Sequence, residues 1–111
     1  MTFHDLVSEV KTLRPDETRV EAEDYLEIVV PSHAVASLRA VLDRFFGPAF
    51  KDAGKNPSAE AQARSKGYGG VQKDQVMYYI ERENQRNCAM LWPWSDGRHV
   101  TVKIAQGLPK R

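Results

Sequence analysis

The chain has few of the residues that most often carry chemistry. Its 111 residues include a single cysteine, Cys88, and three histidines, His4, His33 and His99. One cysteine cannot form an internal disulfide or a tetrathiolate metal site. The histidines lack the paired spacing of zinc sites, so we expect no metal and no cofactor. The composition therefore favours a binding protein over an enzyme.

Long apolar segments are also missing. The longest stretch without a charged residue, Ile28 to Leu38, has 11 residues, whereas a helix needs roughly 20 to cross a bilayer. The first residues alternate apolar and charged side chains, unlike a secretory signal. We therefore expect a soluble, cytoplasmic protein with no membrane partner.

The chain has almost no net charge, because 16 Lys and Arg offset 15 Asp and Glu. The distribution is nevertheless uneven. Residues 1–47 carry five Lys and Arg against nine Asp and Glu, and residues 48–111 carry eleven against six. Such a dipole steers anionic partners to the C-terminal half or promotes head-to-tail self-association, unless it is only a solvated surface. Nucleic-acid domains are usually far more basic than a chain of net charge +1.

Two helices are predicted from apolar residues at helical spacing. The first runs from Phe3 to about Leu13, with Thr2 as N-cap and Asp5 completing an approximate capping box. The second begins at Ser32 as N-cap and stops at Gly47.

Four strands are predicted from β-branched and aromatic residues in alternation. One is Tyr25 to Val30, and three more follow near the C-terminus: Gln75 to Glu83, Asn87 to Trp94, and Arg98 to Gln106. Residues 15–24 read as a connection that can include a short edge strand. The order of elements predicts a single α+β domain over residues 1–111, with helices packed on a mainly antiparallel sheet of about four strands.

The segment between Ala49 and Gln72 reads as an excursion over the surface. Pro57 and Ser58 can start a short polar helix in it that ends near Gly67. Its end is rich in glycine and basic residues, which can form an anion-binding nest, although the P-loop ending Gly-Lys-Ser/Thr is absent. The candidate anion-binding residues are Arg64, Lys66, Gly69, Gly70 and Lys73. A flexible turn explains the same residues, so both interpretations stay open.

The register of the last two strands is predicted from Asp96-Gly97, a strong signal for a type I′ hairpin turn. That turn sets Trp94 opposite His99 and Cys88 opposite Ala105. Cys88 and His99 then lie about 20 Å apart at roughly 3.4 Å per residue, which excludes a catalytic dyad of the two. For the preceding hairpin we expect a four-residue loop, 84–87, that sets Ile80 opposite Leu91.

This register divides the side chains between a core face and a second, aromatic face. The core face carries Val76, Tyr78, Ile80, Ala89, Leu91, Pro93, Val100, Val102 and Ile104. The candidate binding and interface residues on the second face are Met77, Tyr79, Met90, Trp92, Trp94 and His99, beside Thr101 and Lys103. Such residues suit an interface core or a shallow ligand platform, unless the first helix covers them.

The hypothesis we carry forward is a binding or assembly module that forms a homodimer, or binds a protein partner, through the aromatic face. One alternative is a binder of small anions or nucleotides, or a small enzyme, using the loop from Arg64 to Lys73 with His99 and Asp96. Another is a weak nucleic-acid binder with Tyr79 and the tryptophans as stacking platforms. Its phosphate contacts would be Lys51, Lys55, Arg64, Lys66, Lys73, Arg82, Arg86 and Arg98.

Overall fold

The computed structural model describes residues 1–82 and 84–107 of the chain. Within these ranges, five antiparallel strands form one sheet in the order β1-β2-β5-β4-β3. The strands are β1 (Glu17–Ala22), β2 (Tyr25–Pro31), β3 (Val76–Arg82), β4 (Gln85–Pro93) and β5 (His99–Gln106). The helices are α1 (Phe3–Lys11), α2 (Val35–Phe46) and α3 (Ala59–Ser65), with 3-10 turns at Ser32–Ala34 and Lys66–Tyr68. The predicted α+β fold with a mainly antiparallel sheet is confirmed.

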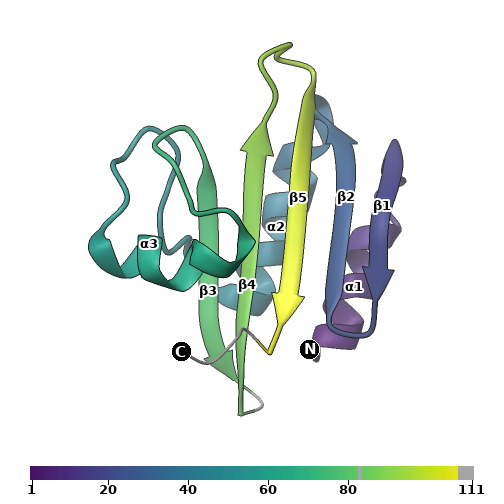
Figure 1. Cartoon of the computed structure of the whole chain (residues 1–111). Helices are drawn as coiled ribbons and strands as arrows, with labels where there is room; N and C mark the ends of the chain where they lie inside the picture. Colours follow the sequence, from purple (N-terminus) through teal and green to yellow (C-terminus); the bar gives the residue numbers. More distant parts are fainter. Residues whose placement is uncertain (83, 108–111) are drawn as a thin grey trace.

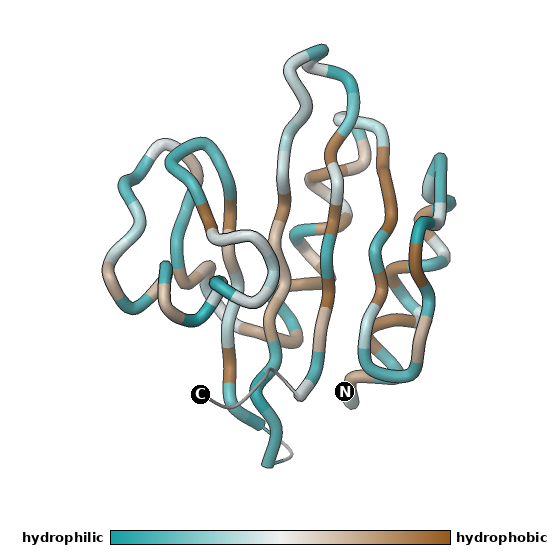
Figure 2. Tube along the Cα trace, in the orientation of Figure 1, coloured by the Kyte–Doolittle hydropathy of each residue, from teal (hydrophilic) through white to brown (hydrophobic). Residues whose placement is uncertain are grey.

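The sheet has a different cover on each side (Figure 1). Helices α1 and α2 pack on one side, which we call the helical face, and bury a core with the strands. The segment 48–75, which includes α3 and which we call the excursion, crosses the other side, the second face. Figure 2 shows that the excursion is mainly hydrophilic, while brown, hydrophobic residues recur along the strands and α2. The excursion is therefore a mainly polar segment that covers part of one face.

The helical face forms because both helices present apolar stripes to alternating strand residues. Leu26, Ile28 and Val30 of β2 are at most 1% exposed, as the alternation predicted. The capping box of α1 is present: the hydroxyl oxygen of Thr2 accepts from the Asp5 amide, and the Asp5 carboxylate accepts from the Thr2 amide. Burial of each apolar side chain of this core, such as Leu26 or Ile28, stabilises the fold by roughly 1.5–3 kcal/mol.

The predicted N-cap role of Ser32 is wrong. The Ser32 hydroxyl donates to the carbonyl of Gly97 at 3.0 Å, and its amide donates to the carbonyl of Arg98 at 2.8 Å. A 3-10 turn therefore intervenes before α2, which starts at Val35. Ser32 ties the start of the helical layer to the β4–β5 turn, a contact that lies 65 residues away in sequence.

β1 is an edge strand, and it lies in residues 15–24, for which the sequence predicts a connection that can include a short edge strand. All its residues are exposed, and its register with β2 shifts between Thr18 and Val20. Three of its residues, Glu17, Arg19 and Glu21, are charged. A bulge and charged side chains on an edge strand oppose pairing with a strand of another chain. Association by strand addition is therefore disfavoured at this edge.

The predicted register of β4 and β5 is confirmed, because Cys88 pairs with Ala105 and the Trp94 amide donates to the His99 carbonyl at 2.9 Å. The predicted turn type is wrong. A type I′ turn needs positive φ at two residues, but only Gly97 has it among the turn residues, with φ 70°. The loop is instead closed by the Asp96 carboxylate, which accepts from the amides of Arg98 and His99.

The predicted register of β3 and β4 is wrong by four residues. β4 already begins at Gln85, so residues 84–87 do not form the loop, and Ile80 pairs with Asn87 where Leu91 was expected. The expected partnership of Glu83 with Cys88 lies outside the described residues. Because the error is an even number, every side chain still points to the face assigned to it. The division into two faces is therefore correct.

Candidate functional site

The excursion covers β3 and β4 on the second face and reaches the ends of β5 and β2, where Tyr68 stacks on Tyr25 with ring centroids 5.9 Å apart. Ala61 and Val71 of the excursion pack on Met77, Met90 and Cys88, and all five are at most 3% exposed. The expectation that α1 could cover this face is wrong, because α1 packs on the helical face. Two of the predicted interface residues, Met77 and Met90, lie beneath the excursion. Burial raises the pKa of the Cys88 thiol to about 12, which leaves it a neutral and unreactive thiol at neutral pH.

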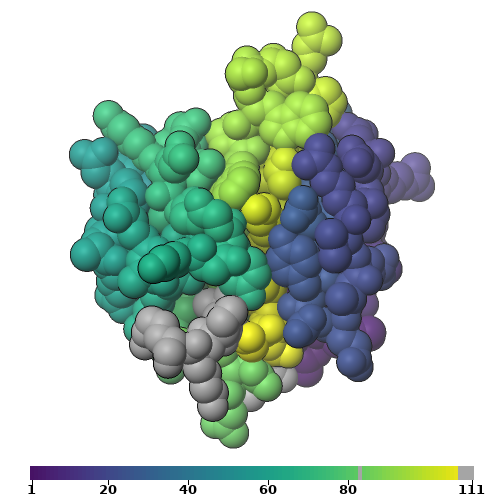
Figure 3. All heavy atoms as spheres, in the orientation of Figure 1, coloured from purple at the N-terminus to yellow at the C-terminus, as the bar shows by residue number. Residues whose placement is uncertain are grey.

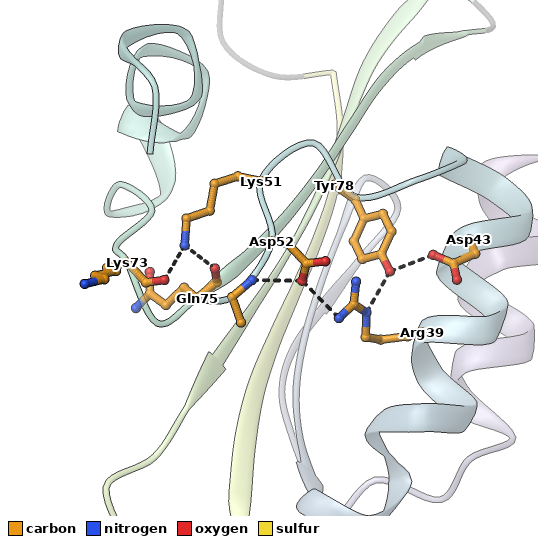
Figure 4. Close-up of polar contacts among 8 residues, drawn as sticks. Arg39, Asp43, Lys51, Asp52, Lys73, Gln75 and Tyr78 are labelled. Atoms are coloured by element: carbon orange, nitrogen blue, oxygen red, sulfur yellow. Dashed lines mark hydrogen bonds and ion pairs between the residues drawn. The ribbon is translucent and has the colours of Figure 1, made fainter. Parts of the chain in front are cut away.

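The buried Lys51 joins the start of the excursion to its end. The side-chain ammonium of Lys51 donates to the carbonyls of Gln72, Lys73 and Gln75, each at 2.6 Å (Figure 4). An ammonium has three donors, and here each has an acceptor. The Lys51 backbone also forms a bridge with Met77 of β3. This clamp joins the two ends of the excursion beside the sheet edge.

A second polar cluster ties the excursion to α2 (Figure 4). The Tyr78 hydroxyl donates to the Asp43 carboxylate at 2.7 Å and accepts from Arg39 Nε at 3.0 Å. Arg39 continues to Asp52 at 3.2 Å, at the start of the excursion. Burial raises the pKa of Tyr78, so its phenol stays protonated and serves as a structural link.

Trp92 lies at the border between the covered and the open part of the second face. Gly69, in the left-handed region with φ +99°, sits against the edge of its indole. Lys103 of β5 places its ammonium 3.6 Å from the centroid of the indole and donates to the carbonyl of Tyr68 at 3.2 Å. A cation over an indole is stabilising, more so when partly desolvated. Burial also lowers the pKa of Lys103, an effect that the charge of Glu27 opposes.

Trp94 and His99 form a second group at the end of the β4–β5 hairpin. Their ring centroids are 4.8 Å apart, and the indole N–H of Trp94 donates to the Thr101 hydroxyl at 2.8 Å. His99 Nδ1 lies 2.6 Å from Oδ2 of Asp96, and its Nε2 lies 3.8 Å from Oδ2 of Asp16. The imidazole is thus held between two carboxylates, with one nitrogen directed to each.

Within residues 1–82 and 84–107, no element covers the rest of the second face, and we call this part the open strip. Figure 3 shows β5, in yellow, between the excursion and the β1–β2 hairpin. The open strip consists of Arg19, Val20, Glu27, Trp92, Trp94 and Lys103. Val20 is 43% exposed, more than most large apolar side chains of the described residues. The guanidinium of Arg19 lies 5.5 Å from the centroid of the Trp94 ring. Here a partner would meet aromatic, apolar and charged groups together.

Comparisons with protein-family models, curated proteins and solved structures found no match to this chain. The site is therefore judged on its geometry. In residues 1–82 and 84–107, no group of three His, Cys, Asp or Glu side chains could hold a metal ion. Nor is any helix of these residues long and apolar enough to cross a membrane.

The candidate interface residues form two patches. Trp92 and Trp94 belong to the open strip, and His99, whose side chain is 34% exposed, adjoins its end. Tyr79 lies on the edge strand β3 beside the excursion, where the guanidinium of Arg64 lies 4.6 Å from its ring centroid and donates to its hydroxyl at 2.8 Å. Sequence reasoning missed Arg19 and Val20, because the segment that contains them has too few apolar residues to stand out as a strand.

The candidate anion-binding residues are only partly brought together. Lys66, Gly69 and Gly70 line an open depression of about 660 Å³ on the excursion. Arg64 instead contacts Tyr79 and Glu60, and Lys73 offers its carbonyl to Lys51. An anion nest needs free backbone N–H groups.

The backbone N–H groups of this loop are already engaged. The amide of Gly70 donates to the Ser65 carbonyl at 2.9 Å, and that of Val71 donates to the Ser65 hydroxyl at 2.9 Å. The amide of Gly69 donates to the Lys66 carbonyl at 3.4 Å. Of the predicted set, the Lys66 side chain is therefore the main group left to meet an anion in this depression.

Several groups proposed for nucleic-acid contact also have internal partners. Lys51 is 5% exposed and held by three carbonyls. Arg82 donates to the Phe45 carbonyl on the helical side of the sheet. Each tryptophan ring carries a cation of this chain on its face, in the position that a stacked base would occupy. These contacts weigh against the nucleic-acid alternative.

Proposed function

We propose that this protein is an assembly module that self-associates through the open strip of its second face. The observation that carries the proposal is the half-open aromatic face itself. The excursion buries Met77 and Met90 but leaves Trp92 and Trp94 partly exposed beside Val20. Aromatic and apolar side chains with a few polar groups are what the centre of an interface requires.

Two further observations support association through this face. The edge strand β1 is bulged and charged, which opposes strand addition at the edge next to the open strip. The single thiol of the chain is not exposed at the open strip, since Cys88 lies beneath the excursion and burial keeps its thiol neutral. Large rigid side chains such as Trp give contact area at low entropic cost.

Sedimentation equilibrium tests the proposal on the intact chain. We expect the wild type to form dimers and Val20→Asp to shift the population to monomers, because the new carboxylate is buried in the contact without a partner. Ala40→Asp, at an exposed position of α2 on the other side of the sheet, is the matched control and should leave the dimer intact. A wild type that stays monomeric up to about 1 mM contradicts the proposal.

A further inference from the structure

Two oppositely charged residues of the open strip face each other but do not pair. Glu27 of β2 and Lys103 of β5 are direct cross-strand partners, a position where opposite charges usually attract. Among the ion pairs of the described residues, none joins these two. Glu27 accepts from the Tyr25 hydroxyl at 2.7 Å and lies 4.0 Å from the guanidinium of Arg19. Lys103 lies on Trp92 and donates to the carbonyl of Tyr68. A carboxylate and an ammonium can each form more hydrogen bonds than these.

The two sides of the second face also differ in charge. Residues 16–24, which contain β1, hold one Arg against five Asp and Glu. The excursion, residues 48–75, holds five Lys and Arg against three Asp and Glu. Two of these charges do not contribute, because Glu21 pairs with Lys11 of α1 and Lys51 is buried against three carbonyls. The β1 side keeps Asp16 and Glu17 with Arg19, and the excursion keeps the exposed Lys55, Lys66 and Lys73. The β1 side of the second face is therefore the more acidic and the excursion the more basic, with Glu27 and Lys103 between the two.

We infer that two copies of this chain pack second face to second face, related by a two-fold axis that runs along β2 and β5 between the sheets. This rotation places Lys103 of each copy over Glu27 of the other. It also sets the basic excursion of each copy against the acidic β1 of the other. In an isologous interface every contact occurs twice, so two reciprocal ion pairs form at the centre.

The inference rests on the proposed function, because it names the partner and the symmetry of the same surface. In a head-to-tail arrangement, each contact would pair the acidic edge of one copy with the basic excursion of the next. The basic excursion of the first copy and the acidic edge of the second would stay unpaired, so the assembly would grow into rings or filaments. The two-fold arrangement satisfies both sides at once and closes at the dimer. It also brings the excursion of one copy against the β1–β2 side of the other, and Figure 3 shows both of these regions on the same face of the chain.

Charge reversal tests the reciprocal pairing. Glu27→Lys alone and Lys103→Glu alone each place like charges opposite each other twice, so we expect each variant to dissociate at least about tenfold more readily than the wild type. Mixing the two variants restores opposite charges at both contacts. A heterodimer of the two variants, detected by native mass spectrometry at low salt, is the expected result.

A matched pair of variants on the helical side controls for general charge effects. Glu9→Lys and Arg44→Glu reverse an ion pair of 2.6 Å between α1 and α2, away from the second face. Neither should weaken the dimer, and their mixture should show no preference for heterodimers. Added salt should weaken the wild-type dimer, since oppositely charged surfaces are screened.

Zero-length cross-linking of the wild type keeps the test decisive if a variant fails to fold. Carbodiimide treatment of mixed 14N and 15N chains should join Glu27 of one chain to Lys103 of another. A wild type that dimerises through Val20 but gives neither this cross-link nor the heterodimer overturns the two-fold arrangement and leaves the proposed function standing. A strictly monomeric wild type overturns both.

Discussion

Gly69 lies so close to Trp92 that a Cβ at this glycine would come within 2.7 Å of Cη2 of the indole. The contact joins the excursion to the border of the open strip, and the glycine has φ +99°, a conformation that side-chain-bearing residues rarely adopt. Close packing at this point holds Trp92 against Lys103. The shape of the open strip therefore depends on a residue that lies outside it.

Gly69→Ala should destabilise the protein more than Gly70→Ala. Both glycines have positive φ, but a Cβ at Gly70 would meet no atom within 4 Å. We expect a strain cost of about 1 kcal/mol for both changes and a further 1–3 kcal/mol, roughly, for the overlap with Trp92. Urea unfolding measures the difference. Equal losses for the two variants would show that the contact with Trp92 is not constraining.

Lys51→Met should lower the free energy of unfolding by about 3 kcal/mol, because charge-assisted hydrogen bonds to three carbonyls are lost in a buried position. Lys55→Met, four residues along the same segment and exposed, is the control and should cost little. Chemical denaturation of both variants provides the measurement. A loss no greater than that of the control is incompatible with a clamp at Lys51.

The thiol of Cys88 reports whether the excursion opens by itself. In the wild type, labelling by a thiol reagent should be very slow, because Cys88 is 2% exposed and its pKa is raised to about 12. In Lys51→Met we expect faster labelling than the population of globally unfolded chains accounts for, since the excursion opens locally. Labelling rates that follow global stability alone would mean that the excursion and the sheet open together.

Asp96 should make the β4–β5 turn sensitive to acid. Hydrogen bonds from the backbone amide of Arg98, the ring of His99 and the His99 amide hold the pKa of Asp96 below its ordinary value. Stability from this carboxylate is therefore present above the ordinary pKa of about 4 and is lost as the pH falls through the lowered value. Asp96→Ala should lower the melting temperature at neutral pH, and its difference from the wild type should vanish in acid.

Asp24→Ala is the control for that measurement, since Asp24 is also exposed. Thermal melts at a series of pH values would compare the three proteins. A difference between Asp96→Ala and the wild type that stays constant from neutral pH into acid contradicts a role for the ionised carboxylate.

The sequence predicts most of this architecture, because its signals are local. Helix α1 with its capping box and the strand β2 follow from spacing alone. The β4–β5 register followed from Asp96-Gly97 even though the turn type did not, since the Asp96 side chain closes the loop in place of a second residue with positive φ. The β3–β4 register failed because the sequence offers no comparable turn signal between Arg82 and Gln85.

The cover of the second face could not be predicted from the sequence. Nothing in the spacing of Ala61 and Val71 indicates that they pack on Met77 and Cys88. In the sequence Lys51 cannot be told from an exposed surface lysine. Only the fold brings the carbonyls of Gln72, Lys73 and Gln75 around its ammonium. Similarly, Glu27 and Lys103 become neighbours only through the β2–β5 pairing. Contacts between distant segments decide which aromatic residues stay open.

Radical footprinting of the wild type at low and at high protein concentration tests self-association through the open strip most directly. Oxidation of Trp92, Trp94 and Val20 is followed by mass spectrometry, with Met1, an exposed residue outside the open strip, as the internal reference. The account predicts that these three residues become protected as concentration rises while Met1 does not. Equal oxidation of the open strip at all concentrations would contradict it.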